Sequence, residues 1–149
     1  MDAVTYPQPA VQEFISDNLI ALREPYDGRT AADFKVTWTP TIAIIDWNGQ
    51  EHHRTVGFLP AEELIASLLL GCSKVYCDLE QFDRASEPLE KLLSAHSRTD
   101  AAPEGMYVRG VCGYKSTHNP GPLKAAYEQL QKHYPNSPWT KRAQPYSLL

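Results

Sequence analysis

The residues of this sequence best suited to chemistry are a proline and three cysteines. Pro40 follows Trp38 and Thr39 and stands directly before a β-branched, apolar run. An X–Pro bond takes the cis form more readily than other peptide bonds, and a retained cis-proline usually shapes a defined turn. We therefore expect a cis Thr39–Pro40 bond. Two roles stay open: Pro40 only shapes the entry to a strand, or its loop faces a bound peptide or thiol. Trp38 is either a contact for a partner or a cap on the core, and we favour the core.

The three cysteines show no arrangement for thiol chemistry. Cys72 and Cys77 are five positions apart on a predicted helix, so their side chains diverge by about 140° and cannot bridge without unwinding it. Cys112 lies on another apolar helix face. Free cysteine is among the most buried residue types. We expect three buried free thiols and no catalytic residue.

The other polar residues also lack a recognisable site. His52 and His53 are neighbours on a predicted strand and should point to opposite faces. Asp46 and Arg54 could pair across the same hairpin. No glycine-rich phosphate loop is present, and the remaining histidines fall near predicted helix ends: His96, His118 and His133. We expect no metal site and no cofactor.

Composition restricts the kinds of partner. The chain has 149 residues, 42% of them hydrophobic and 21% charged, which is normal for a globular protein. Its net charge is −4 without any Lys/Arg cluster, so we expect neither nucleic acid nor a membrane surface as partner. The longest apolar run, residues 64–71, is too short to span a bilayer. An odd cysteine number and no secretory signal at the given start predict the cytoplasm.

The first seventy residues predict alternating helices and strands. Asn48-Gly49 is a strong hairpin signal after a buried apolar strand. Pro60 is suited to a first helical turn, and Thr30 is a candidate N-cap. The expected order is a helix over 8–18, a strand over 19–26, a short helix over 29–36, hairpin strands over 40–47 and 50–58, and a helix over 60–70.

From Gly71 onward the pattern is helical and shows an internal repeat. Tyr76 and Tyr114 are 38 positions apart, and the same offset joins Leu92 to Leu130. It also joins Leu89 to Tyr127 and Cys72 to Gly110. A tyrosine ahead of small or apolar positions, closing in Pro135, resembles the tetratricopeptide helix pair, although that repeat is usually about 34 residues long. The tail tyrosines should be packing residues rather than a peptide groove: Tyr107, Tyr114, Tyr127 and Tyr134.

Residues 1–70 resemble the thioredoxin-like family, in its short single-domain type. "VTWTPT" is similar to the family's loop before a core strand, in which the proline is cis. "DWNGQEHHRTVGFLPAEEL" is similar to its Asp-x-x-Gly hairpin, the arginine and Gly-aromatic that follow, and the final helix. The resemblance implies a thioredoxin-like α/β domain over residues 1–70, lacking its first strand and Cys-x-x-Cys pair. A tetratricopeptide-like all-α tail over 71–149 follows it.

This missing strand is the main departure from the family. It would lie between the strands expected over 19–26 and 40–47, whose buried backbone groups would otherwise lack partners. Two explanations stay open: Met1 is an internal methionine of a longer reading frame, or the chain completes its sheet as a homodimer or by swapping.

By resemblance the full-length form is a thiol-disulfide oxidoreductase in which Trp38, Thr39 and Pro40 bind a protein or peptide substrate. This chain alone should be inactive, because that chemistry requires a reactive cysteine pair. The alternative is a non-catalytic module that binds another protein.

Overall fold

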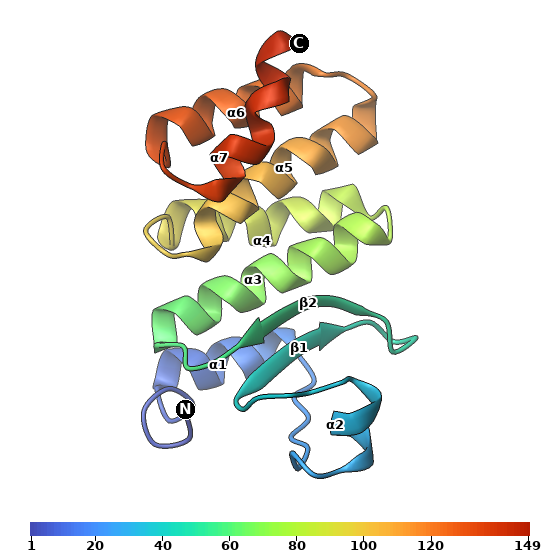
Figure 1. The fold of residues 1–149 in the computed structure, drawn as a ribbon, viewed down its shortest axis with the longest axis vertical. Helices are drawn as coiled ribbons and strands as arrows, with labels where there is room; N and C mark the ends of the chain where they lie inside the picture. Colours follow the sequence, from blue (N-terminus) through green and yellow to red (C-terminus); the bar gives the residue numbers. More distant parts are fainter.

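The computed structural model describes residues 1–149 as a mostly helical α/β protein with seven α-helices and one two-stranded sheet. Figure 1 shows the hairpin and the first two helices at one end, the later helices stacked on them, and the termini near opposite ends. The elements are α1 (Pro9–Asn18), α2 (Arg29–Asp33), β1 (Thr41–Ile45), β2 (Glu51–Val56), α3 (Ala61–Asp78), α4 (Phe82–Ala95), α5 (Ala101–Thr117), α6 (Gly121–His133), α7 (Pro138–Ala143) and a 3-10 helix (Gln144–Leu148).

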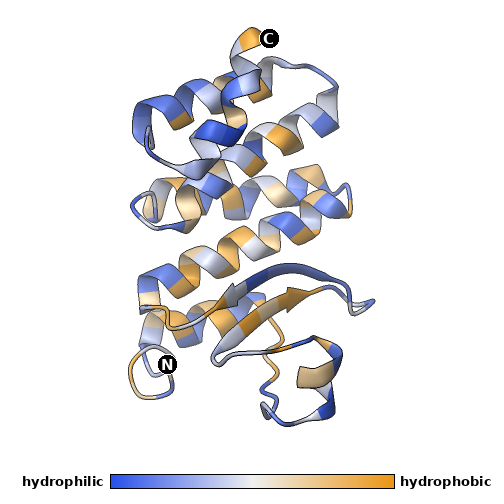
Figure 2. Ribbon diagram, in the orientation of Figure 1, coloured by the Kyte–Doolittle hydropathy of each residue, from blue (hydrophilic) through white to orange (hydrophobic).

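The predicted hairpin is confirmed. β1 and β2 pair antiparallel, with Thr41 opposite Val56. The Asp46 carboxylate closes the turn by accepting hydrogen bonds from the backbone N–H groups of Asn48 (2.8 Å) and Gln50 (2.9 Å). Gly49 has a φ of +81°, which glycine adopts without steric cost. Figure 2 shows the contrast between the hydrophobic β1 and the hydrophilic β2.

The strand predicted over residues 19–26 is wrong. The segment between α1 and α2 forms no strand, and the sheet ends at β1. Its apolar side chains are uncovered, with Ile20 94% and Leu22 77% exposed. Apolar residues in a row favour a strand only when a neighbouring strand can bond with them, and this chain places none there.

The short helix α2 is confirmed, but its N-cap is Gly28 rather than the predicted Thr30. Arg54 ties the helix to the hairpin, because its guanidinium donates to the Phe34 carbonyl at 2.7 Å. The same guanidinium donates to Glu51, with 2.7 Å from Nε to Oε1. The predicted pair of Arg54 with Asp46 is therefore wrong, since each side chain has nearer partners.

Helix α3 begins after Pro60, as predicted, and is the central element of the fold. It carries ten buried residues because it packs on both strands of the sheet and on α1, α4 and α5. Gly71 permits the approach of the hairpin: a Cβ there would lie 2.6 Å from Cγ1 of Ile44. The helix runs without a break through residues 70 and 71, the expected boundary between two domains.

The helices from α3 onward form stacked pairs, as Figure 1 shows, with α3 against α4, α4 against α5, and α5 against α6. Leu92 and Leu130, joined by the 38-residue offset, are both fully buried. Gly110 lies against α6, where an added Cβ would be 2.5 Å from that of Ala126. Three of the four tail tyrosines, Tyr107, Tyr127 and Tyr134, pack around a buried cluster of Met106, Leu130 and Ala143. The fourth, Tyr114, is 40% exposed.

A disulfide joins α3 to α5, between Cys77 and Cys112. The expectation of three free thiols is therefore wrong, and only Cys72 is free. The partners are 35 residues apart on different helices, a pairing that comparison within one helix could not find. The disulfide removes one reason for predicting a reducing compartment. None of the helices has the length and apolar character needed to cross a bilayer.

Candidate functional site

The loop before β1 brings together the three predicted site residues. The Thr39–Pro40 bond is cis, as expected. The Pro40 carbonyl accepts from the Gly57 N–H at 2.8 Å, and the Thr41 hydroxyl donates to the Trp38 carbonyl at 2.7 Å. Trp38 is 67% exposed, so the expectation that it caps the core is wrong. The loop thus presents an indole and the Thr39 backbone at the surface.

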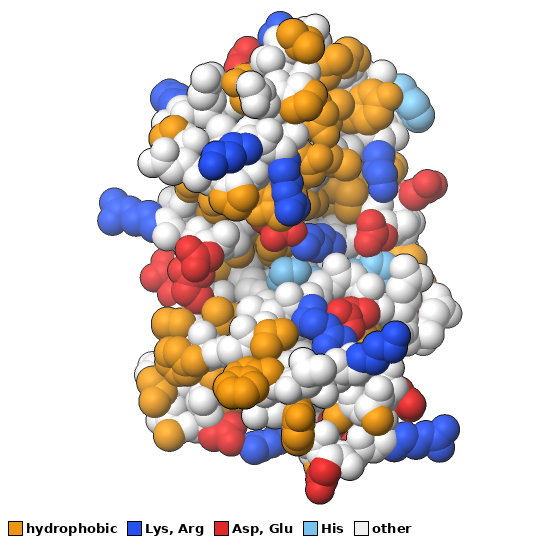
Figure 3. Space-filling model, in the orientation of Figure 1, with side chains coloured by type: hydrophobic (Ala, Val, Ile, Leu, Met, Phe, Trp, Pro, Cys, Tyr) orange, Lys and Arg blue, Asp and Glu red, His pale blue; other side chains and the backbone are white.

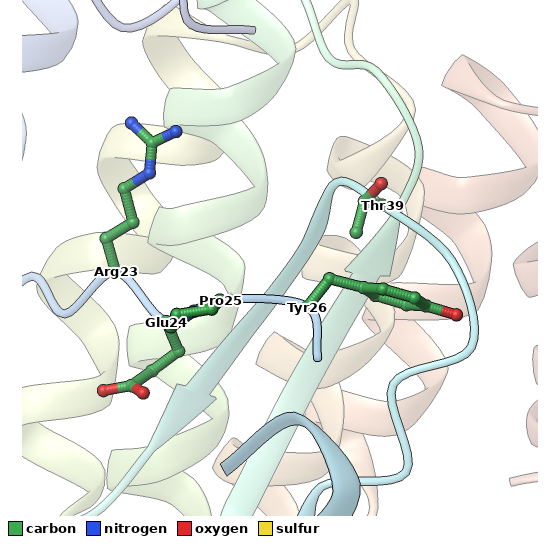
Figure 4. Close-up of a pocket in the computed structure, with 5 residues that line it drawn as sticks. All are labelled: Arg23, Glu24, Pro25, Tyr26 and Thr39. Atoms are coloured by element: carbon green, nitrogen blue, oxygen red, sulfur yellow. The ribbon is translucent and has the colours of Figure 1, made fainter. Parts of the chain in front are cut away.

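Thr39 also lines a pocket of about 440 Å³, here called the edge pocket. Its other lining residues are Arg23, Glu24, Pro25 and Tyr26, from the irregular segment after α1. Figure 4 shows this segment passing beside the hairpin, with Thr39 on the loop above Tyr26. Tyr26 is 57% exposed, and its hydroxyl lies 3.4 Å from the Thr37 carbonyl. The sequence predicted a strand over residues 19–26, and for this reason Tyr26 was missed as a candidate binding residue.

His52 is held between two carboxylates. Its Nδ1 lies 2.7 Å from Asp78 and its Nε2 lies 3.3 Å from Asp46, and the ring is 1% exposed. Burial lowers the pKa of His52, but the hydrogen bonds to Asp78 and Asp46 outweigh this effect and hold the pKa above its usual value. When the ring is protonated it donates from both nitrogens, and its contacts link the hairpin to the end of α3.

Both neighbouring histidines reach α3, so the prediction of opposite faces is wrong. A β-bulge is the reason: Ile44 pairs with His53 and Ile45 with Glu51, which leaves His52 as an extra residue. A bulge breaks the strict alternation of side chains along a strand. Figure 3 shows exposed histidine atoms (pale blue) in a hollow of the surface, between the end of the molecule that holds the hairpin and the end that holds the later helices.

His53 belongs to a polar network that resembles a catalytic group but cannot work as one. Its Nε2 lies 3.0 Å from the Ser67 hydroxyl, which lies 2.7 Å from that of Thr55. The Lys74 ammonium donates to Nδ1 at 3.2 Å and also pairs with Glu104. Because Nδ1 accepts from Lys74, the ring proton resides on Nε2 and is donated to Ser67. The ring therefore cannot remove a proton from Ser67.

The pKa of His53 agrees with that assignment. Burial and the nearby Lys74 charge lower it to about 4. The ring is thus neutral at neutral pH, and its contacts join β2, α3 and α5 in a satisfied structural network.

The cysteines offer no nucleophile. Cys77 and Cys112 are oxidised and 4% and 5% exposed. Burial raises the pKa of the free Cys72 thiol, which disfavours the reactive thiolate. No group of His, Cys, Asp and Glu side chains is arranged to hold a metal ion. The exposed loop and the edge pocket remain as the candidate site.

Comparison with known proteins does not add a relative: no family model, no curated protein and no solved structure matches this chain.

Proposed function

We propose that this chain is a thioredoxin-like protein whose loop of Trp38, Thr39 and Pro40 binds an extended segment of a protein substrate in thiol-disulfide exchange. The observation that carries the proposal is the exposure of this loop next to the edge pocket. An indole in solvent and a free backbone beside it suit a peptide that adds to the sheet as a short strand.

The exchange itself requires a cysteine pair that this sequence does not supply. One thiolate attacks a sulfur of the substrate disulfide, forms a mixed disulfide and releases the other sulfur as a thiolate. The second cysteine then displaces the reduced substrate and leaves the pair oxidised. Cys77 and Cys112 cannot fill these roles because they are already bonded to each other, and the raised pKa of the half-buried Cys72 disfavours its thiolate. The pair would come from a polypeptide segment outside the sequence given, and the reaction requires no cofactor.

A second candidate is a non-catalytic module that binds a protein through the same loop. The buried disulfide and the raised pKa of Cys72 favour it, since they leave this chain without a redox centre. The same disulfide is typical of an oxidising compartment. In the reducing cytoplasm it would persist only because its burial shields it from reductants.

Insulin reduction separates the two functions. The assay compares this chain with a version extended by the codons in frame before Met1. Activity of the extended version alone supports the oxidoreductase, and its loss in a Trp38→Ala variant supports the role of the loop. Inactivity of both versions, with no cysteine pair in the extension, supports the binding module. An extended version that is equally active with Trp38→Ala, Thr39→Ala and Pro40→Ala would refute the proposed site.

A further inference from the structure

The His52 ring joins the hairpin to the last residue of α3 through two carboxylates. Its Nδ1 lies 2.7 Å from Oδ2 of Asp78, and its Nε2 lies 3.3 Å from Oδ2 of Asp46. The imidazole and the Asp46 side chain are 1% and 2% exposed, whereas the Asp78 side chain is 49% exposed. We call these three side chains the histidine bridge.

Both ends of the histidine bridge are fixed by other bonds. On the hairpin side, Oδ1 of Asp46 accepts the two backbone N–H groups that close the turn, which leaves Oδ2 to His52. On the helical side, Asp78 directly follows Cys77, which the disulfide holds to α5. The bridge therefore connects a closed turn to an anchored helix end.

Two anions face the His52 ring, one from each element packed against it. These are Asp46, just after β1, and Asp78, at the end of α3. The other charged side chains of β2 and of the second half of α3 have partners of their own: Glu51, Arg54 and Lys74. The charge of the ring thus decides whether two donors or one meet the two carboxylates.

Loss of one proton leaves the histidine bridge with too few donors. A neutral imidazole has a single N–H, and its other nitrogen turns a lone pair towards the second carboxylate. Oδ2 of Asp46 is enclosed, and a buried ionised acceptor without a donor is costly. Asp78 can instead turn into water. The neutral ring should therefore keep its proton on Nε2 and lose Asp78, although Asp78 is the nearer partner of the protonated ring.

We propose that the histidine bridge is a pH-sensitive switch: the protonated His52 holds the hairpin to the end of α3, and the neutral His52 releases Asp78 while it keeps Asp46. The hairpin turn stays closed, and the contact that opens is the one between the bulge of β2 and the last turn of α3. The raised pKa of His52 puts the release above about pH 6.5. The switch goes beyond the proposed peptide binding, because no residue of that loop takes part.

Heteronuclear NMR of the whole chain tests the switch, because it reports the protonation of each ring nitrogen separately. At low pH both nitrogens of His52 should carry a proton. As pH rises through the folded pKa, Nδ1 should lose its proton and Nε2 should keep its own. Over the same pH range, nuclear Overhauser contacts from the ring to the Asp78 β-protons should be lost, while those to Asp46 should remain.

Two matched variants locate the controlling proton. Asp78→Asn removes one of the two anions, so the pKa of His52 should fall from its value in the unchanged chain. Its amide can donate to Nδ1 of the neutral ring, so the contact between residues 52 and 78 should persist at high pH. His133→Gln changes an exposed histidine on another element and should leave the release of Asp78 unchanged.

Either of two results overturns the proposal. One is a neutral His52 with its proton on Nδ1 and its contact to Asp78 intact, because the hairpin would then stay attached to α3. The other is loss of the contact between residues 52 and 78 in Asp78→Asn at the same pH as in the unchanged chain, which would place the controlling proton on another group.

Discussion

Breaking the disulfide between Cys77 and Cys112 should cost a large part of the stability of this protein. The bond closes a loop of 35 residues between α3 and α5. In the chain-entropy treatment, releasing a loop of this length stabilises the unfolded state by about 4 kcal/mol at 25 °C. A domain of ordinary stability has a free energy of unfolding of about 5–15 kcal/mol, so the reduced protein should remain folded with about 1–11 kcal/mol.

Urea unfolding with and without reductant measures the effect. With a slope of about 2 kcal/mol per molar urea, the midpoint should fall by about 2 M in reductant. Cys77→Ala/Cys112→Ala should show the lower midpoint in both conditions, because it has no bond to lose. Cys72→Ala is the matched control and should keep the full response to reductant, since Cys72 is free.

The reasoning is refuted by either of two results. One is an unchanged midpoint in reductant after mass spectrometry has shown that the bond is broken. The other is alkylation of all three cysteines in unfolded but unreduced protein, which would mean that the bond is absent.

Three further predictions concern the histidines and the helix interface. The stability that the charged His52 contributes is complete below its unfolded pKa of about 6.5 and is lost as pH rises through its raised folded pKa. The Tm should therefore fall over that pH range, and His52→Gln should remove this fall. An equal fall of the Tm in both proteins would contradict the prediction. His53 should titrate by NMR with a midpoint of about pH 4. The stability that the neutral ring contributes should be lost as pH falls from about 6.5 towards that value. A midpoint near 6.5 would show that its network with Lys74 does not form. Gly110→Ala should cost about 1–3 kcal/mol by overpacking against Ala126, and Gly110→Ala/Ala126→Gly should recover part of it; no recovery would place the strain elsewhere.

Short sequence patterns correctly predicted the hairpin, the start of α3 and the helices of the tail, because the residues that determine these elements are close together in sequence. Asn48-Gly49 identified the hairpin, because few residues other than glycine adopt the φ of +81° found at Gly49. Pro60 marked the start of α3, and the periodicity of the tail predicted its helices. The cis Thr39–Pro40 bond was predicted from one short motif, since the residues that suggested it are adjacent in sequence.

Features that depend on long-range contact were missed. Cys77 meets Cys112 only because α3 and α5 cross at that level of the stack. The bulge that turns His52 towards Asp78 depends on the register of two strands, and strand alternation alone predicts the wrong face. The segment with Ile20 and Leu22 has the composition of a strand, yet a strand also requires a neighbour that composition cannot supply.

The buried position of α3 between the hairpin and the helical stack has a consequence for unfolding. Its ten buried residues face neighbours on both sides, so neither side can lose its structure without uncovering the same helix. The whole chain should therefore unfold as one cooperative unit. Fluorescence from Trp47 in the hairpin and from Trp139 in α7, each measured with the other tryptophans replaced by phenylalanine, should report the same midpoint as the loss of helical circular dichroism.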